Sequence, residues 1–331
     1  MRARPRASWL RLIFFAVGVA MVVIFVRRVG LREIVTPLRN VGPRVLWLLV
    51  PYAIGTTIGA FPWAWLLSPR VRPRALGVVL GRFAASSANS LLPFFGLAGE
   101  PSRLLWLPRS ARAEGLAAIV VDRALYNAGS ALLLLGGAIV AFLATPLPRL
   151  LVGAAAVTAI VMLTVTVALC WMALRLGVGR GTATLLRRFL GEQYAGAEFG
   201  RAVDGALLTL IRGPRARLWL GVSCHFLSRA AIALEVYLGL RLLHVSVGLA
   251  PAFVLSVVPI ALSVFFSSIP SLLGVQEGAQ TLVASALLLN PALVLTVVLL
   301  QRGRQLFFSL LMPVFLGSAR PSPAQREGAG G

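Results

Sequence analysis

Long apolar runs alternate with short polar stretches along the whole chain. A run of about 20 apolar residues is long enough to cross a bilayer as an α-helix. Six segments are expected to do so, with approximate bounds at residues 9–26, 45–67, 116–143, 150–174, 218–243 and 292–316. The pattern therefore predicts an all-α polytopic integral membrane protein with about six full spans.

Two other apolar stretches contain breaks that a plain membrane span does not tolerate. Residues 75–107 form two arms around Pro93, and neither arm is comfortable as a full span. Residues 250–289 form two arms around Pro270. Non-helical backbone at membrane depth is tolerated only where protein buries it or where it lines a wet cavity. We therefore expect two re-entrant helical hairpins, each of which enters and leaves the membrane on one side.

The two broken stretches share one design. Pro93 is followed seven residues later by Glu100, and Pro270 is followed seven residues later by Glu277, with glycine between them in both cases. The first half of the chain has two spans before its hairpin and one after it, which is an odd total. The second half then starts on the other side, so the repeats are expected to be inverted. We expect one transmembrane domain, residues 1–317, with half-repeats at about 9–144 and 150–317.

The polar segments outside the spans predict surface and tail structure. Residues 31–41 have the spacing of a short interfacial amphipathic helix. Residues 175–217 form the longest polar stretch, which is basic and predicts one or two surface helices. Residues 318–331 are rich in Pro, Gly and Ser and are expected to be a disordered tail. Residues 1–11 are basic, and no small-residue cleavage site follows the first apolar run, which predicts an uncleaved first span.

Composition supports the membrane assignment. The chain is 58% hydrophobic and 13% charged, whereas about 25% of the residues of a soluble domain are charged. The formal net charge is +22, all basic residues are arginine, and this charge suits an anionic membrane surface. Nucleic-acid binding is not expected, because the arginines are not clustered on a soluble domain. More arginines fall on the side of residues 70–74 and 175–217 than on the other, which predicts a cell-membrane protein with a cytoplasmic N-terminus.

Residues of catalytic or metal-binding type are sparse in this sequence. Cys170 and Cys224 lie in apolar runs, where small buried side chains are the simplest interpretation. His225 is expected in the core and His244 at the end of a span. Two distant histidines and two distant cysteines lack metal-ligand spacing, and no catalytic constellation is visible. We therefore expect no cofactor, no metal and no enzymatic activity.

Carboxylates inside apolar segments need partners, and the sequence has four of them: Glu100, Asp122, Glu235 and Glu277. An unpaired carboxylate at the centre of a membrane helix costs about 2.5–3.5 kcal/mol. Arg103 follows Glu100 by three residues, on the same helical face. Glu277 has no basic neighbour, so Arg302 or Arg304 of the next span is its expected partner.

Two further pairs of opposite charges are placed unfavourably for pairing with each other. Asp122 and Arg123 are adjacent, but their side chains point about 100° apart on a helix. Arg229 and Glu235 are six residues apart, and we expect them to serve helix packing. All four side chains are therefore expected to pair with other segments.

The candidate site is a polar cavity where the two hairpins meet. Its arginines would receive an anionic headgroup, because the planar guanidinium binds phosphate through two parallel hydrogen bonds. Broken helices also offer free backbone N–H groups at their ends. The candidate substrate-binding residues are Asn89, Pro93, Gly99, Glu100, Arg103, Asp122, Arg123, Pro270, Gly274, Glu277, Arg302 and Arg304. The alternative stays open that these charges only pair with each other and fix helix packing.

Three motifs with family-like spacing occur in order along the chain. They are Asn89-x3-Pro93-x5-Gly99-Glu100-x2-Arg103, then Val121-Asp122-Arg123, then Pro270-x3-Gly274-x2-Glu277-Gly278. The pattern resembles the lysylphosphatidylglycerol synthase transmembrane, or flippase-like, family over about residues 12–316. That family often carries Gly-Asp where this chain has Gly99-Glu100. Its second hairpin often reads Gly-Gly-x-Gly, of which only Gly274 remains here.

This resemblance implies lipid translocation, or a supporting role in making polyprenyl- or glycolipid-linked surface material. Larger members carry a soluble aminoacyltransferase domain, which is absent from these 331 residues, so aminoacyl-lipid synthesis is not expected. We expect a flippase-like transporter of an anionic, aminoacylated, polyprenyl-linked or glycosylated lipid. Two alternatives stay open: a non-transporting subunit that supports a glycosyltransferase or lipid-modifying enzyme of the cell envelope, and an intramembrane enzyme acting on a lipid phosphate. The expected partners are membrane lipids and such a membrane or peripheral enzyme.

Overall fold

The computed structural model of the chain describes residues 39, 41–91, 99–177, 197–266, 269 and 272–319. Every regular element in these ranges is helical, and no strand occurs among them, which confirms the predicted all-α class. The expected span at residues 9–26 lies outside the described residues, as do nearly all of the connector at 31–41 and most of the C-terminal tail.

The expected span at residues 45–67 is a series of short helices. The 3₁₀ helix η1 (Gly42–Leu48) leads into α3 (Leu49–Ile58), and α4 (Phe61–Leu66) follows after a break of two residues. Pro62 lies in the first turn of α4, where its missing N–H group leaves no helical hydrogen bond unmade. The interruption predicted at Pro62 is thus confirmed, whereas Pro51 lies in the first turn of α3 and does not break it.

The first broken stretch folds back on itself. Its arms are α5 (Ala75–Leu91) and the 3₁₀ helix η2 (Glu100–Trp106), which pack against each other, while residues 92–98 lie outside the described residues. A Cβ atom on Gly99 would come within 2.2 Å of the Ala85 carbonyl oxygen, so only glycine allows the arms to approach this closely. The short helix η3 (Arg109–Ala111) then leads into α6 (Arg112–Ala144).

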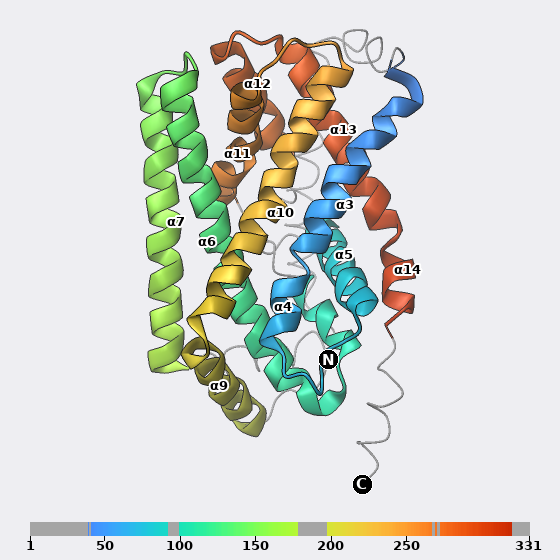
Figure 1. The fold of residues 1–331 in the computed structure, drawn as a ribbon, viewed down its shortest axis with the longest axis vertical. Coiled ribbons are helices and arrows are strands. Elements are labelled where there is room, and N and C mark those ends of the chain that lie inside the picture. Colours follow the sequence, from blue (N-terminus) through green and yellow to red (C-terminus); the bar gives the residue numbers. More distant parts are fainter. Residues whose placement is uncertain are drawn as a thin grey trace, which may run out of the picture.

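The remaining helices follow the expected segments closely. After α6 the order is α7 (Arg149–Leu176), α9 (Ala197–Arg212), α10 (Arg215–Leu242), α11 (Leu249–Phe266), α12 (Val275–Ala286), α13 (Pro291–Leu310) and α14 (Met312–Gly317). Helix α9 is the surface helix expected in the basic segment, and Figure 1 shows it lying across the lower end of the bundle. Its buried residues Val203 and Leu207 pack against the base of α6.

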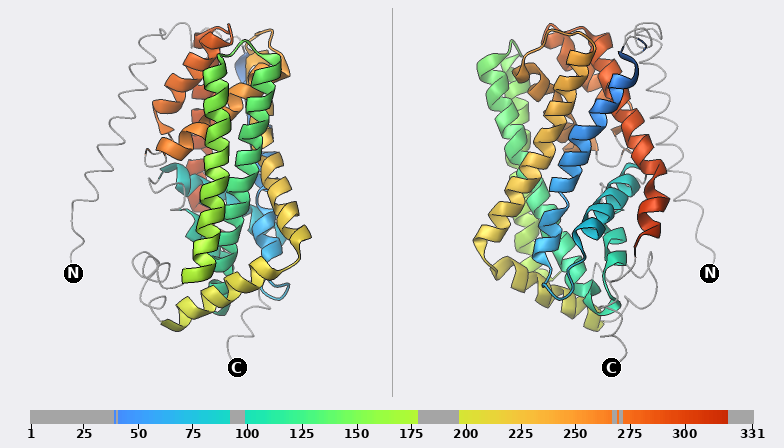
Figure 2. Two further views of the ribbon diagram at one scale, coloured as in Figure 1. Left: turned by 90° about the vertical axis from the view of Figure 1, so that its left-hand side faces the viewer. Right: turned by 45° about the vertical axis from the view of Figure 1, so that its right-hand side comes forward.

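The helices differ in how far they extend through the molecule (Figures 1 and 2). Helices α6, α7 and α10 run for most of its height. Helix α5 rises from the lower end and stops near mid-height, with η2 beside it. Helices α11 and α12 lie in the upper half, with the chain entering α11 and leaving α12 at the upper end. The two broken stretches therefore reach the middle of the molecule from opposite ends.

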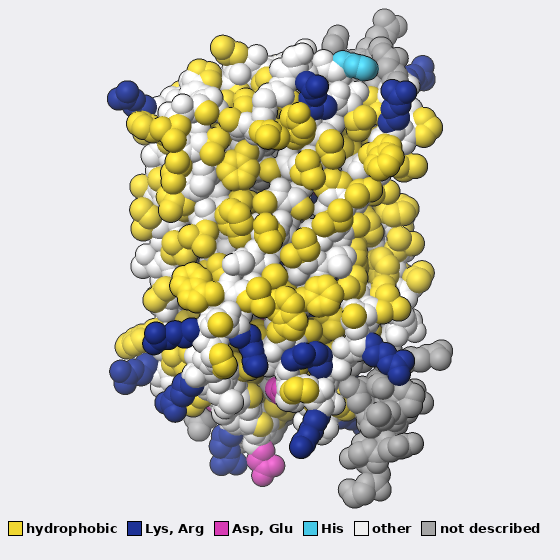
Figure 3. Space-filling view, viewed as in Figure 1, with side chains coloured by type: hydrophobic (Ala, Val, Ile, Leu, Met, Phe, Trp, Pro, Cys, Tyr) yellow, Lys and Arg dark blue, Asp and Glu magenta, His cyan; other side chains and the backbone are white. Residues whose placement is uncertain are grey.

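The outer surface is apolar over most of its height. Five described stretches are long and apolar enough to cross a membrane: Gly42–Leu66, Arg109–Ala144, Arg149–Arg175, Leu249–Phe266 and Pro291–Gly317. Figure 3 shows the hydrophobic side chains over the middle of one face, with arginines gathered mainly at its lower rim. Two outcomes differ from the predicted set of spans. Helix α10, which contains buried His225 and Glu235, is not among the five, whereas α11, expected as a hairpin arm, is.

Candidate functional site

Arg103 lies at the centre of a buried charge network. Its Nη1 atom is 2.9 Å from Glu100 Oε2 and 2.8 Å from Asp122 Oδ2, and its guanidinium stacks 4.6 Å from the centre of the Trp63 ring. The side chain is 1% exposed. One guanidinium therefore serves two carboxylates that would each be costly to bury alone.

The other oxygen of Asp122 binds a histidine on a neighbouring helix. His225 Nε2 of α10 lies 2.9 Å from Asp122 Oδ1, and the ring is fully buried. Helices α6 and α10 approach closely here because Gly129 has no side chain. A Cβ atom at this position would lie 2.9 Å from the Phe226 backbone nitrogen. His225 Nδ1 is buried and has no hydrogen-bond partner within the described part of the chain.

Glu100 ties together α5 and η2, the two arms of the first broken stretch. Asn89 Nδ2 of α5 donates to Glu100 Oε1 over 3.2 Å, and Asn89 Oδ1 accepts from the Gly99 N–H over 2.7 Å. Arg82, also on α5, places Nη1 3.6 Å from the same Glu100 oxygen. The amide and the carboxylate that the sequence singled out thus hold the same hairpin from its two sides.

Three arginines from three helices converge on the ring of Tyr126. The guanidinium carbons of Arg123, Arg229 and Arg82 lie 4.7, 5.1 and 5.7 Å from the ring centre. Cations within about 6 Å of an aromatic ring face are attracted by its quadrupole. The Tyr126 ring also packs edge-on against His225, with ring centres 5.5 Å apart. The tyrosine therefore holds three like charges in one small region.

We call these side chains together the Tyr126 cluster, and it consists of Arg82, Glu100, Arg103, Asp122, Arg123, Tyr126, His225 and Arg229. It contains four arginines and two carboxylates. Among these eight side chains, the arginines therefore outnumber the carboxylates by two. Such an excess of buried arginine over carboxylate is suited to receive an anion.

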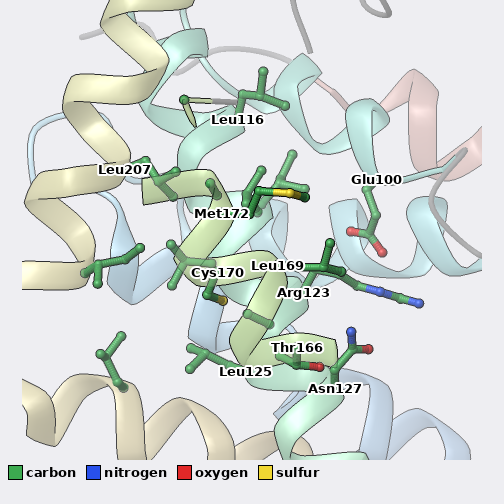
Figure 4. A pocket seen from close by; sticks show the side chains of 18 of the residues that line it. Glu100, Leu116, Arg123, Leu125, Asn127, Thr166, Leu169, Cys170, Met172 and Leu207 are labelled. Atoms are coloured by element: carbon green, nitrogen blue, oxygen red, sulfur yellow. The ribbon is translucent and has the colours of Figure 1, made fainter. Parts of the chain in front are cut away.

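An apolar pocket of about 640 Å³ adjoins the cluster between α6, α7 and α9. Figure 4 shows Glu100 and Arg123 next to each other at one side of it. Asn127 and Thr166 add polar atoms, and the other lining side chains are almost all aliphatic. Polar and apolar walls thus meet at Arg123.

The second broken stretch contains a separate pair, Glu277 and Arg302. Arg302 Nε of α13 donates to Glu277 Oε1 of α12 over 2.7 Å, and Glu277 Oε2 accepts from the Gly274 N–H over 2.7 Å. Gly274 has φ +77°, a backbone conformation that suits glycine. Arg302 Nη1 donates to Gln305 Oε1 over 3.0 Å. This carboxylate both caps α12 and pairs with α13.

A third pair joins α10 to α13. Arg304 Nη1 lies 3.1 Å from Glu235 Oε2, and the Arg304 guanidinium lies 3.8 Å from the centre of the Tyr52 ring of α3. The Glu235 side chain is fully buried. We call the two ion pairs Glu277–Arg302 and Glu235–Arg304 the α13 pairs. Each matches one arginine with one carboxylate.

The profile of the family described as "Lysylphosphatidylglycerol synthase TM region" matches residues 8–312. This chain belongs to that family. No curated protein and no solved structure gave a match. The resemblance inferred from the three motifs is therefore confirmed, and it identifies a membrane protein of lipid-related processes.

The structure of this family member brings together most of the site residues predicted in the first half of the chain. They are Asn89, Gly99, Glu100, Arg103, Asp122 and Arg123. The pairing of Glu100 with Arg103 is confirmed, and Asp122 pairs with other segments as expected. Pro93 lies outside the described residues.

The predicted residues of the second hairpin form their own contacts in this family member. Gly274, Glu277 and Arg302 lie together, which confirms Arg302 as the partner of Glu277, while Arg304 pairs with Glu235. Pro270 lies outside the described residues. None of these side chains lines the pocket beside Arg123. Arm α5 of the first broken stretch packs instead on α13, for example through Ser90 Oγ and Ser309 Oγ at 2.8 Å.

Sequence reasoning missed two members of the Tyr126 cluster and gave two others only a packing role. Arg82 and Tyr126 were not singled out, while His225 and Arg229 were expected to serve the core. A usable signal exists for Arg82, because it is the one charged residue of α5. Tyr126 carries no such signal, since an aromatic residue on a membrane helix is ordinary.

Proposed function

We propose that this protein moves an anionic or lipid-linked amphiphile between leaflets and receives its headgroup at the Tyr126 cluster. The observation that carries the proposal is the surplus of two arginines over carboxylates in that cluster. Membership of a lipid-related membrane family agrees with it. A phosphate group would balance the charge, and guanidinium groups bind phosphate oxygens with strong, directional hydrogen bonds.

The four arginines have different roles within the cluster. Arg103 contacts both carboxylates at 2.8–2.9 Å and fixes η2 against α6. Arg82, Arg123 and Arg229 lie against the Tyr126 ring, and Arg82 also lies 3.6 Å from Glu100 Oε1. Since a charge held by a ring face keeps N–H donors at its edges, these three can bind an anion without losing their ring contacts. We assign headgroup binding to them and a positioning role to Arg103.

The arrangement of the broken stretches supports transport. We propose that α5–η2 and α11–α12 are re-entrant hairpins of an inverted repeat, because they reach mid-height from opposite ends. Inverted repeats with broken helices at the membrane midplane are the common design of secondary transporters. Rocking of one repeat against the other would expose the Tyr126 cluster to each leaflet in turn.

The distribution of arginine supports an orientation. The lower end receives the loop between α4 and α5, helix α9 and the start of α10, and Figure 3 shows arginines concentrated there. By the positive-inside rule this end faces the cytoplasm. We therefore propose a multi-pass cell-membrane protein with a cytoplasmic N-terminus, because three described spans, and one more predicted from the sequence at residues 9–26, separate the N-terminus from residues 175–217.

The α13 pairs receive a packing role in this proposal. Each joins one arginine to one carboxylate and leaves no formal charge over. If the protein were a non-transporting subunit, all of its buried arginines and carboxylates would be expected to pair one to one, as the α13 pairs do. The surplus in the Tyr126 cluster is what separates the two functions.

The proposal is tested in proteoliposomes with fluorescent phosphatidylglycerol and fluorescent phosphatidylcholine as probes. Chemical quenching from outside measures the rate at which each probe crosses the bilayer. Arg229→Gln and Arg123→Gln should each slow phosphatidylglycerol transfer about tenfold or more, the effect of losing one charge-assisted hydrogen bond. Arg229→Lys should retain part of the rate, because it keeps the charge.

Arg241→Gln is the matched control. Arg241 also lies on α10, but it is exposed in the last turn at the upper end. Its loss should leave transfer of both probes unchanged. If the unaltered protein transfers neither of these probes nor a fluorescent polyprenyl phosphate, the transport proposal is wrong.

A further inference from the structure

The apolar pocket beside Arg123 has a polar end and an apolar end. One stripe of α6 lines it, and this stripe runs from Leu116 through Ile119 and Val120 to Arg123 and Asn127. These positions recur every three to four residues, so they share one helical face. At 1.5 Å per residue the stripe is about 17 Å long. The polar side chains occupy only its upper part.

The opposite wall repeats this gradient. On α7, Thr166 stands opposite the polar end, and Cys170 and Ala173 continue toward the apolar end. Leu207 and Ile211 of the surface helix α9 close that end. The pocket is thus a slot that begins at the proposed headgroup site. Its walls become less polar toward the lower end of the molecule.

We propose that this pocket holds one hydrocarbon chain of the lipid whose headgroup lies at Arg123. The inference rests on the proposed function and adds a site for the second part of the same ligand. The volume of about 640 Å³ is within the range of about 300–1,000 Å³ that is usual for small-molecule sites. An aliphatic slot with polar groups at one end fits an amphiphile, and a free inorganic anion would leave most of it without a partner.

The pocket is also placed to admit a chain from the bilayer. Leu169 and Met172 of α7 line it and are 51% and 45% exposed, so its rim is continuous with the lipid-facing surface. A chain gains little hydrophobic free energy by leaving lipid for an equally apolar slot. Occupancy therefore depends on the headgroup contacts at one end and on the shape of the slot along its length.

The first experiment uses a phosphatidylglycerol with a photoreactive diazirine at the end of one acyl chain. The full-length protein is reconstituted with a trace of this probe, irradiated, digested and analysed by mass spectrometry. Adducts are expected on Leu207 and Ile211 of α9. Ala173→Phe fills the slot and should lower their yield about tenfold. Ala168→Phe is the matched control on the exposed face of the same helix and should leave the yield unchanged.

The second experiment needs no altered protein. Cys170 lines the pocket, whereas the other cysteine, Cys224, does not. Phosphatidylglycerol with 16-carbon chains should slow maleimide labelling of Cys170 several-fold more than phosphatidylglycerol with 6-carbon chains. Labelling of Cys224 should be equal in both lipids, which makes it the internal reference.

The outcomes separate the chain site from the proposed function. Equal protection of Cys170 by both chain lengths, or α9 adducts that are equal in Ala173→Phe and Ala168→Phe, would overturn the chain site. In that case, slow phosphatidylglycerol transfer in Arg229→Gln would still support the proposed function. Adducts at α9 that disappear in Ala173→Phe, while the unaltered protein transfers none of the fluorescent probes, would keep the chain site as a lipid-binding slot and reject the transport proposal.

Discussion

The guanidinium of Arg103 and the carboxylate of Asp122 lie 2.8 Å apart although 19 residues separate them in the chain. The contact joins the returning arm of the first hairpin to α6 and brings Glu100 into the same network. It places η2 against the part of α6 that contacts His225.

Replacing Arg103 with Leu should destabilise the protein strongly. Two carboxylates would lose their shared partner, and breaking a buried ion pair on one side costs about 3–5 kcal/mol. The thermal unfolding midpoint in detergent measures the loss. Adding Asp122→Asn to Arg103→Leu should recover part of it. Arg201→Leu, at an exposed position of α9, is the control and should unfold like the parent protein. An unchanged midpoint in Arg103→Leu would contradict the network.

Tyr126 should be replaceable by Phe but not by Leu. The ring face attracts three guanidinium groups, at about 0.5–2 kcal/mol each, and Phe keeps that face. Leu would leave the arginines to repel each other. Tyr126→Leu is expected to lower both the unfolding midpoint and the rate of phosphatidylglycerol transfer, with Tyr126→Phe close to the parent protein. Equal behaviour of the two variants would show that the ring does not organise the cluster.

Glu277→Gln should lower the stability of the protein, and it should slow transport only through that loss of stability. The change removes the charge that Arg302 faces at 2.7 Å and weakens the acceptor for the Gly274 N–H. We expect a loss of about 3–5 kcal/mol, and a transfer rate that returns toward normal when the assay is cooled. Glu198→Gln, at the exposed start of α9, is the control. A stable Glu277→Gln protein without transfer activity would instead place Glu277 in the substrate site.

Single cysteines should report the sidedness of both hairpins. Arg70 and Arg109 flank α5–η2, and Arg241 and Asn290 flank α11–α12. In a background without native cysteines, labels at Arg70→Cys and Arg109→Cys should react from one side of the membrane. Labels at Arg241→Cys and Asn290→Cys should react from the other side. Opposite sidedness within either pair would turn that hairpin into a full crossing and end the inverted-repeat proposal.

Much of the fold was predictable because apolar run length alone marks a membrane helix. The segments expected at 116–143 and 150–174 correspond to α6 and α7, and the break expected at Pro62 is present. The contacts at short sequence distance were equally accessible, since Glu100 and Arg103 share one face of a single turn. The partner of Glu277 was narrowed to two arginines because α13 holds only these two.

The composition of the Tyr126 cluster was less predictable. Asp122 meets His225 across 103 residues, and no periodicity in either helix announces that contact. A helix that is apolar almost all round gives no signal for the direction in which a single polar side chain points. The role assigned to Arg229 was therefore packing, and Tyr126 went unnoticed.

The sequence by itself determined that this chain is a helical membrane protein with two broken, acid-bearing stretches, and its motifs identified the family. Hydrocarbon imposes these features directly, because it selects long apolar helices and tolerates breaks only where protein covers them. Only the tertiary structure decided which charges meet. That choice depends on the rotation and close approach of α5, α6 and α10, and it gave Arg103 two carboxylates and gathered three more arginines around Tyr126.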